Sequence, residues 1–149
     1  MTEDTQADIG KGLYFMPLGG SAEIGENFYL YAVDDAWIIV DCGVRFGDEA
    51  TPGIDVIMPD PAFIEARRKK LLGIVLTHGH EDHFGAIEHL WDRLRVPVYG
   101  TPFTTSLLRL KLEDRRAESP VELITVDHGD RLKLGPFDIE FVRVTHSIP

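Results

Sequence analysis

The sequence predicts a single α/β domain, and three observations support that prediction. Its 149 residues are enough for one hydrophobic core and too few for two. Hydrophobic residues make up 44% and charged residues 27%, the balance of an ordinary globular protein and not of a disordered chain or a coiled coil. Strand-like apolar runs alternate with amphipathic, helix-like segments along the chain, and this interleaving is typical of α/β proteins.

The N-terminus predicts a disordered tail without a targeting segment. Residues 1–10 are too polar to order by burial, so we expect the folded domain to span 11–149. The tail has no basic start and no apolar stretch, which argues against a signal peptide, and no apolar run approaches the ~20 residues of a membrane helix. Cys42 is the single cysteine and cannot form an internal disulfide, so a reducing, cytoplasmic compartment is expected.

Apolar periodicity predicts the strands and helices in turn. The predicted strands share strict alternation or a short continuous apolar run: 13–18, 28–33, 36–41, 73–77, 96–99, 121–126, 131–134 and 137–145. The predicted helices share apolar residues at helical spacing or a proline in the first turn: 61–71, 84–94 and 101–116. Irregularly spaced glycine, proline and aspartate predict a long loop over 43–60.

The charge balance argues against nucleic-acid binding through the electrostatic field of the chain itself. Lysine and arginine number 15 against 25 acidic residues, which gives a formal net charge of −10. A nucleic-acid-binding surface is normally basic. Binding at a site where metal ions supply the positive charge remains compatible with this composition.

The sharpest chemical signal is the segment Thr77–His83, which directly follows a predicted buried strand. It reads Thr-His-Gly-His-Glu-Asp-His. His78 and His80 stand two apart in an extended segment, so both rings can reach one metal ion at ~2.0–2.1 Å. Asp82 and His83 follow where the chain turns into the next helix and point to a neighbouring position. The segment therefore predicts two divalent ions, an arrangement that suits hydrolysis by a metal-activated hydroxide.

Two further residues are candidates for the same site. His146 ends the last predicted strand, from which it can reach a loop at the same sheet edge, although an ordinary exposed histidine fits the sequence as well. Asp41 ends the 36–41 strand and can orient a ligand imidazole by accepting its other ring N–H. A turn aspartate is an equally good interpretation of Asp41 from the sequence alone.

Other polar features are expected to be structural. Cys42 is interpreted as a small buried side chain, His89 as a structural residue on a helix and His128 as a structural residue in a turn. The basic run Arg67–Lys70 is expected to be a solvated helix end. The loop Gly19–Gly25 can approach a phosphate with its backbone amides, which by itself is a weak signal.

The motifs together resemble the ribonuclease J family of the metallo-β-lactamase superfamily. The H-x-H-x-D-H pattern after a buried strand is shared by the superfamily, and the surrounding loops indicate the family. The segments that carry the resemblance are 18–27 (LGGSAEIGEN), 53–60 (GIDVIMPD), 73–83 (GIVLTHGHEDH), 96–102 (VPVYGTP) and 145–149 (THSIP). They span nearly the whole chain.

The resemblance implies a role for each candidate residue. His78, His80 and His146 would bind one metal ion, and Asp82 and His83 would bind the second. Asp82 and His83 would also act in catalysis, with Asp82 placed to interact with the nucleophilic water. Asp41 would support the ligand loop from outside the ligand set.

The resemblance also implies the fold and the reaction. The fold would be the metallo-β-lactamase αββα sandwich with an inserted β-CASP domain. The activity would be RNA phosphodiester hydrolysis, as 5′-to-3′ exonuclease and endonuclease, on 5′-monophosphorylated RNA in decay and processing. The enzyme would use two divalent ions, zinc first with manganese or magnesium as alternatives. It would be cytoplasmic and would form a homodimer or homotetramer. No membrane partner is expected.

The sequence departs from the family pattern at its C-terminal end. It stops at the start of the family's Thr-His-Ser-Ile-Pro-Asp-Ser motif, before the bridging aspartate, the last metal histidine, the β-CASP insertion and the second half of the sandwich. We therefore expect an N-terminal part of the domain that binds metal weakly and cleaves RNA poorly or not at all. The alternatives are a thioester, lactone or β-lactam hydrolase of the same superfamily, and a non-catalytic metal-binding fragment.

Overall fold

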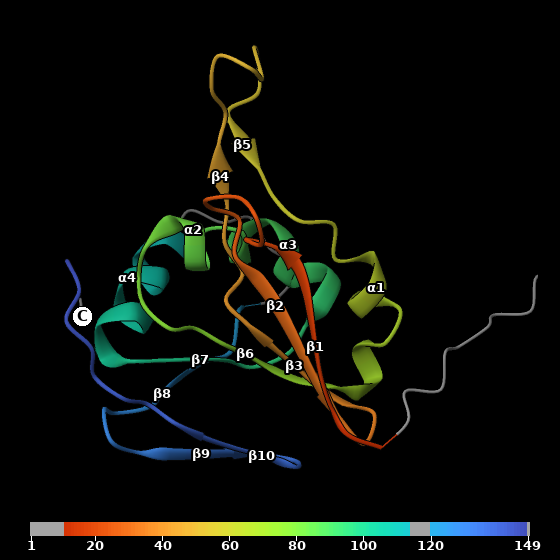
Figure 1. The fold of residues 1–149 in the computed structure, drawn as a ribbon. Helices are drawn as coiled ribbons and strands as arrows, with labels where there is room; N and C mark the ends of the chain where they lie inside the picture. The colour runs from red at the N-terminus through yellow and green to blue at the C-terminus, as the bar shows by residue number, and fades with distance from the viewer. Residues whose placement is uncertain (1–10, 114–119, 149) are drawn as a thin grey trace, which may run out of the picture.

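The computed structural model describes residues 11–113 and 120–148, and a six-stranded mixed sheet forms its centre (Figure 1). In spatial order its strands are β1 (Leu13–Gly19), β2 (Phe28–Val33), β3 (Ala36–Val40), β6 (Leu71–Val75), β7 (Val98–Gly100) and β8 (Leu123–Thr125). The β1–β2–β3 pairs are antiparallel, whereas β3, β6, β7 and β8 run parallel. The carboxyl ends of β3, β6 and β7 and the amino end of β2 therefore meet at one edge.

One face of the sheet packs against the helices. In β2 the side chains of Phe28, Leu30 and Ala32 are fully buried on this face, as strand alternation requires. The helices that cover it are α1 (Ala62–Glu65), α2 (Glu81–Phe84), α3 (Ile87–Leu94) and α4 (Pro102–Leu112). They lie together on one side of the sheet (Figure 1), and burial of their apolar sides forms the larger of two hydrophobic clusters.

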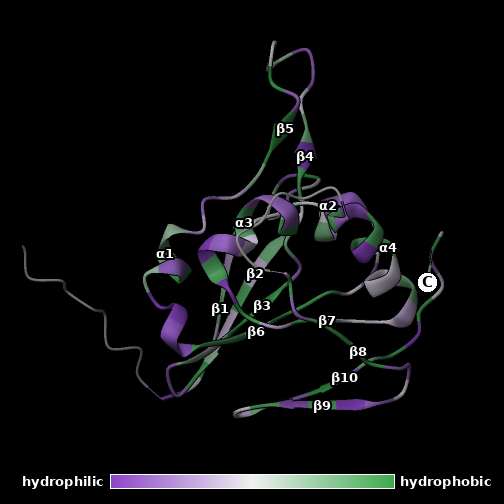
Figure 2. Cartoon of the chain, turned by 180° about the vertical axis from the view of Figure 1, so that it is seen from behind, coloured by the Kyte–Doolittle hydropathy of each residue, from purple (hydrophilic) through white to green (hydrophobic). Residues whose placement is uncertain are grey.

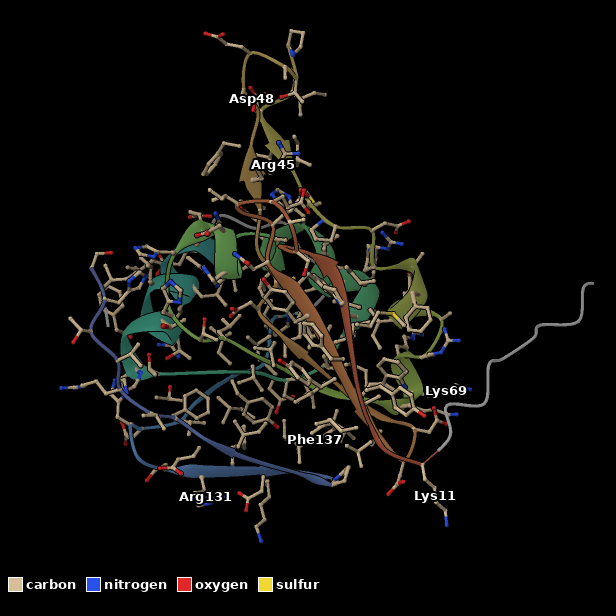
Figure 3. All side chains as sticks on the ribbon, in the orientation of Figure 1. Lys11, Arg45, Asp48, Lys69, Arg131 and Phe137 are labelled. Carbon is tan, nitrogen blue, oxygen red and sulfur yellow. The ribbon has the colours of Figure 1, made fainter. Side chains whose placement is uncertain are left out.

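The other face of the sheet is covered by a separate hairpin, β9 (Arg131–Leu134) and β10 (Phe137–Glu140). Phe137 lies between this hairpin and the sheet, and Arg131 lies on its outer side (Figure 3). Hydrophilic colour dominates β9 in Figure 2, because one side of the hairpin faces away from the core. Helices, sheet and hairpin thus give the α, β and β layers of the predicted sandwich.

The predicted loop over 43–60 is wrong in part, because it contains a second hairpin. Strands β4 (Arg45–Phe46) and β5 (Val56–Ile57) pair antiparallel. The arm that they form projects away from the body of the protein, and Arg45 and Asp48 mark its base and its far part (Figures 1 and 3). Two-residue strands are too short for alternation to reveal them in a sequence.

Several predicted boundaries are also wrong. The predicted helix 61–71 ends at Glu65, and a 3-10 turn over Arg68–Lys70 leads into β6 two residues early. The predicted strand 137–145 ends at Glu140, because its partner β9 has only four residues to pair with. His146 therefore lies beyond the strand, not at its end. The predicted tail 1–10 and the last three residues of the 101–116 helix lie outside the described residues.

The predicted helix 84–94 is divided in two, and the division places half of the histidine motif on a helix. α2 begins at Glu81, so Asp82 and His83 are helical rather than part of the preceding loop. The helix is interrupted after Phe84, because the N–H of Ala86 donates to the carbonyl of Cys42 at 2.9 Å and not to the carbonyl of Asp82 four residues before it. None of the helices within 11–113 and 120–148 is long and apolar enough to cross a membrane.

Candidate metal centre

Three histidines from two distant segments converge at the carboxyl edge of the sheet. Nε2 of His78 lies 3.0 Å from Nδ1 of His80, and Nε2 of His146 lies 3.1 Å from each of these atoms. The lone pairs of three ring nitrogens this close repel one another unless a proton or a cation lies between them. Imidazole nitrogen is a preferred ligand of zinc, so the donor set and its spacing fit a divalent transition metal.

Hydroxyl groups beside the opposite ring nitrogens are compatible with the tautomers that leave these lone pairs free. Nδ1 of His78 lies 2.9 Å from the hydroxyl of Thr77, and Nε2 of His80 lies 3.1 Å from the hydroxyl of Ser147. When each of these nitrogens donates its proton to the hydroxyl oxygen, the converging nitrogen of the same ring is unprotonated. This is the arrangement that orients metal-binding histidines in proteins.

His78 is held in its neutral form. Burial, followed by the nearby His83, lowers the pKa of His78 to about 4 against the opposing charge of Asp41. The ring therefore carries no positive charge at neutral pH, as a metal ligand requires.

A second pair of donor atoms lies directly beside the first cluster. The His78 and His83 ring centroids are 4.1 Å apart, and Nε2 of His83 lies 3.4 Å from Oδ2 of Asp82. A spacing of 3.4 Å is compatible with two ligands of one tetrahedral ion. The described residues thus offer a three-histidine cluster and an adjacent carboxylate–imidazole pair.

Asp41 organises both groups from the end of β3. Its buried carboxylate accepts hydrogen bonds from the Thr77 backbone N–H at 2.8 Å, from the Thr77 hydroxyl and from Nδ1 of His83 at 2.7 Å. Burial alone would lower the pKa of His83, but the hydrogen bond and charge of Asp41, with the charge of Asp82, raise it above its usual value. The bond also keeps the proton on Nδ1, which leaves Nε2 directed at Asp82.

The backbone of Asp41 is left-handed, with φ of 63°. Glycine adopts this region most readily, and among residues with a side chain aspartate and asparagine tolerate it best. The turn carries the chain out of β3, while the N–H of Asp41 donates to the carbonyl of Val75 at 2.9 Å. The residue type at 41 therefore serves both the turn and the hydrogen bonds to Thr77 and His83.

Gly43 allows the loop after β3 to pack directly on α2. A Cβ at this position would overlap the carbonyl of Asp82 and crowd the amide of His83. We expect Gly43→Ala to displace α2 and to lower the free energy of unfolding by about 3 kcal/mol, the upper range for overpacking a close contact. Chemical denaturation of the two proteins measures this loss.

Gly100→Ala is the matched control, because a Cβ at this buried strand end would make ordinary contacts of 3.4 Å or more. It should change the free energy of unfolding by less than about 1 kcal/mol. Equal effects of the two substitutions would contradict the close approach at Gly43.

Lys111 of α4 forms ion pairs with α2 and α3. Its ammonium lies 2.6 Å from Glu81 and 2.9 Å from Glu88, and it is the bridge between the first residue of α2 and the start of α3. Burial alone would lower the pKa of Lys111, but the hydrogen bonds and charges of the two carboxylates together raise it. The pair Asp82–His83 is therefore held from both sides of α2.

An apolar cavity of about 580 Å³ adjoins the histidine cluster on the hairpin side of the sheet. His78 and His146 contribute to its wall, together with apolar side chains from β3, β6 and the segment after β10. Val142 and Val144 in that segment are 68% and 75% exposed. The cluster thus lies at the border between the sheet edge and this apolar space.

The candidate site residues come together. One sheet edge brings together the side chains of Asp41, His78, His80, Asp82, His83 and His146. Of the residues expected to be structural, His89 lies apart, whereas Cys42 donates its backbone N–H to His83 and His128 lines the same cavity as His78 and His146. Cys42 is buried, and burial strongly raises the pKa of its thiol. His89 is on α3 beside Glu88, 3.5 Å away. The contacts of Thr77, Ser147 and Asn27 with the site could not be predicted, because these residue types carry no metal-site pattern of their own.

Comparison with known proteins first defines the superfamily to which the chain belongs. The family model of the metallo-β-lactamase superfamily matches residues 23–147, which include all six predicted site residues. The chain belongs to this superfamily, and both the predicted fold and the predicted class of metallohydrolase are confirmed.

Within the superfamily the sequence is similar to ribonuclease J. It is 45% identical over 141 residues to ribonuclease J of Sinorhizobium meliloti, covering 92% of this chain and 25% of that protein. It is 36% identical over 139 residues to ribonuclease J 2 of Staphylococcus aureus, covering 93% of this chain and 25% of that protein. The predicted resemblance is confirmed, and the chain spans about a quarter of the length of these relatives.

Solved structures agree on the fold. The metallo-β-lactamase fold protein YhfI from Bacillus subtilis superimposes with a TM-score of 0.61 at 21% identity, over 91% of this chain and 54% of that one. A diphosphatase from the PhnP family gives a TM-score of 0.58 at 17% identity, over 85% and 55%. At these identities the structures support the architecture alone.

Proposed function

We propose that the natural protein containing this chain is a metal-dependent ribonuclease that hydrolyses RNA phosphodiester bonds at this sheet edge. The observation that carries the proposal is the convergence of three histidine nitrogens within 3.1 Å of one another in a chain similar to ribonuclease J. Hydrolysis of a phosphodiester needs positive charge at the reacting phosphate. This chain has a net charge of −10, so bound cations are the natural source of it.

The residues divide into two metal-binding groups. His78, His80 and His146 would hold one divalent ion, and Asp82 and His83 would contribute to the second. Zinc is the first choice for such ligands, with manganese or magnesium as alternatives. When bound, the two ions lower the pKa of water and offset negative charge on the phosphate.

The other side chains hold protons and rings in place. Asp41 keeps the proton of His83 on Nδ1, and Thr77 does the same for His78. Asp82 is 39% exposed and is the carboxylate of the pair that can accept a proton from the attacking water. His83 completes the proposed catalytic pair.

The wider properties of the proposal follow the similarity to ribonuclease J. The substrate is 5′-monophosphorylated RNA, cut by 5′-to-3′ exonuclease and endonuclease action in RNA decay and processing. The active form is a homodimer or homotetramer in the cytoplasm. The similarity to two ribonuclease J proteins supports RNA as the substrate.

Substrate selectivity and metal removal test the proposal together. We expect the natural protein to cleave 5′-monophosphorylated RNA and to leave thioester and lactone substrates intact. Chelation should lower the rate of RNA cleavage by about a thousandfold, since metal ions contribute several kcal/mol to such reactions, and added zinc or manganese should restore it. Thioester or lactone hydrolysis without RNA cleavage would contradict the proposal and favour another hydrolase of the superfamily.

A further inference from the structure

Asn27 approaches the Asp82–His83 pair from the amino end of β2. Its side-chain Nδ2 lies 3.0 Å from the carbonyl oxygen of Asp82, 3.3 Å from Oδ2 of the same residue and 3.3 Å from Nε2 of His83. Its backbone N–H also donates to the Asp82 carbonyl at 3.0 Å. The amide group therefore lies against both donor atoms of the pair.

The orientation of the amide follows from its neighbours. The carbonyl of Asp82 can only accept a hydrogen bond, so the group that faces it must be the NH₂ of Asn27. The amide oxygen then points the other way, to the hydroxyl of Tyr29, which donates to it at 2.7 Å. Tyr29 and Asp82 thus select the same orientation of the Asn27 amide from opposite sides.

The second hydrogen of the NH₂ group lies between two atoms that otherwise repel each other. With the proton of His83 on Nδ1, Nε2 offers a lone pair, and Oδ2 of Asp82 is a carboxylate oxygen only 3.4 Å away. A donor shared by both atoms offsets this repulsion. Without it, the partly exposed Asp82 side chain is free to rotate away from His83.

The glycine-bearing loop makes room for this arrangement. A Cβ at Gly20 would lie 2.5 Å from both the amide oxygen of Asn27 and the hydroxyl of Tyr29, and the φ of Gly20 is +78°. The carbonyl of Gly20 is also within 3.1 Å of the Tyr29 hydroxyl. Gly20 therefore lets the loop approach Asn27 and Tyr29 closely.

We propose that Asn27 is a positioning residue that holds Asp82 and His83 at ligand spacing before the second metal ion binds, and that Tyr29 fixes Asn27 for this role. The inference rests on the proposed function, because it assumes that Asp82 and His83 contribute to a metal site. It extends that function by assigning the Tyr29–Asn27 pair to the affinity for the second ion.

The test is a titration of the metal-free natural protein with Co²⁺ at pH 8, followed by visible absorption, which reports the surroundings of each ion. In Asn27→Ala the affinity for the second equivalent should fall by about 10- to 100-fold, the usual effect of losing a group that orients metal ligands. In Tyr29→Phe it should fall by about two- to tenfold, the equivalent of one hydrogen bond. The first equivalent should bind as in the wild type.

Tyr31→Phe is the matched control, since it also removes a tyrosine hydroxyl from β2. The Tyr31 hydroxyl takes part in none of the hydrogen bonds described above. It should leave both equivalents unchanged. Tyr29→Phe keeps the test decisive if Asn27→Ala does not fold. Unchanged binding of the second equivalent in Tyr29→Phe and in a folded Asn27→Ala would overturn the inference and leave the proposed function standing. A wild type that binds no second Co²⁺ would overturn both.

Discussion

Replacing His78 and His80 together by alanine in the natural protein is expected to remove the metal ion from the three-histidine cluster and to abolish RNA cleavage. The two rings supply two of the three converging nitrogens, and His146 alone is a weak ligand. Loss of the ion removes several kcal/mol of transition-state stabilisation, so the cleavage rate should fall by about a thousandfold or more. Metal analysis and a 5′-monophosphorylated RNA assay on the same preparation measure both effects.

The matched control for this double variant is His89→Ala. His89 is on the exposed side of α3 and contacts Glu88, away from the converging rings. This variant should keep its metal content and its cleavage rate within about twofold, as expected for a surface substitution. Cleavage by the double variant at the wild-type rate would show that the reaction takes place elsewhere.

Asp41→Asn is expected to weaken the second metal position and to destabilise the fold. Asparagine suits the left-handed backbone at this position, so the substitution changes the hydrogen bonding and charge with little change in shape. Its NH₂ group must face either Thr77 or His83, both of which donate to the carboxylate. We expect about 10- to 100-fold weaker binding of the second ion and a loss of about 1–3 kcal/mol in unfolding free energy.

Asp34→Asn provides the comparison for this variant. Asp34 also has a left-handed backbone, with φ of 48°, but lies exposed in the turn between β2 and β3. The substitution should leave metal affinity unchanged and alter the unfolding free energy by less than about 0.5 kcal/mol. Calorimetric metal titration and denaturant unfolding distinguish the two variants. Wild-type metal affinity in Asp41→Asn would contradict the orienting role of the carboxylate.

The local part of the site could be predicted from the sequence because its chemistry depends on short spacing. His78 and His80 are two residues apart, and Asp82 and His83 follow at once. The meeting of His146 with these residues is different, because 66 residues separate it from His80 and only the fold brings them together. From the residues alone His146 was one candidate among exposed histidines, and the family resemblance selected it.

The residues that orient the ligands could not be predicted, because their types are common at strand ends and turns. Thr77, Ser147 and Asn27 matter only through the partner that the fold gives them. The break between α2 and α3 was missed for a similar reason. The apolar periodicity of α3 is evident in the sequence, whereas the tertiary hydrogen bond from the N–H of Ala86 to the carbonyl of Cys42 is not.

Anomalous scattering from crystals of the zinc-loaded natural protein, recorded on both sides of the zinc absorption edge, tests the central claim most directly. The account predicts one zinc peak among His78, His80 and His146 and a second beside Asp82 and His83. Well-ordered density for these side chains with no anomalous peak between the three histidines would contradict it.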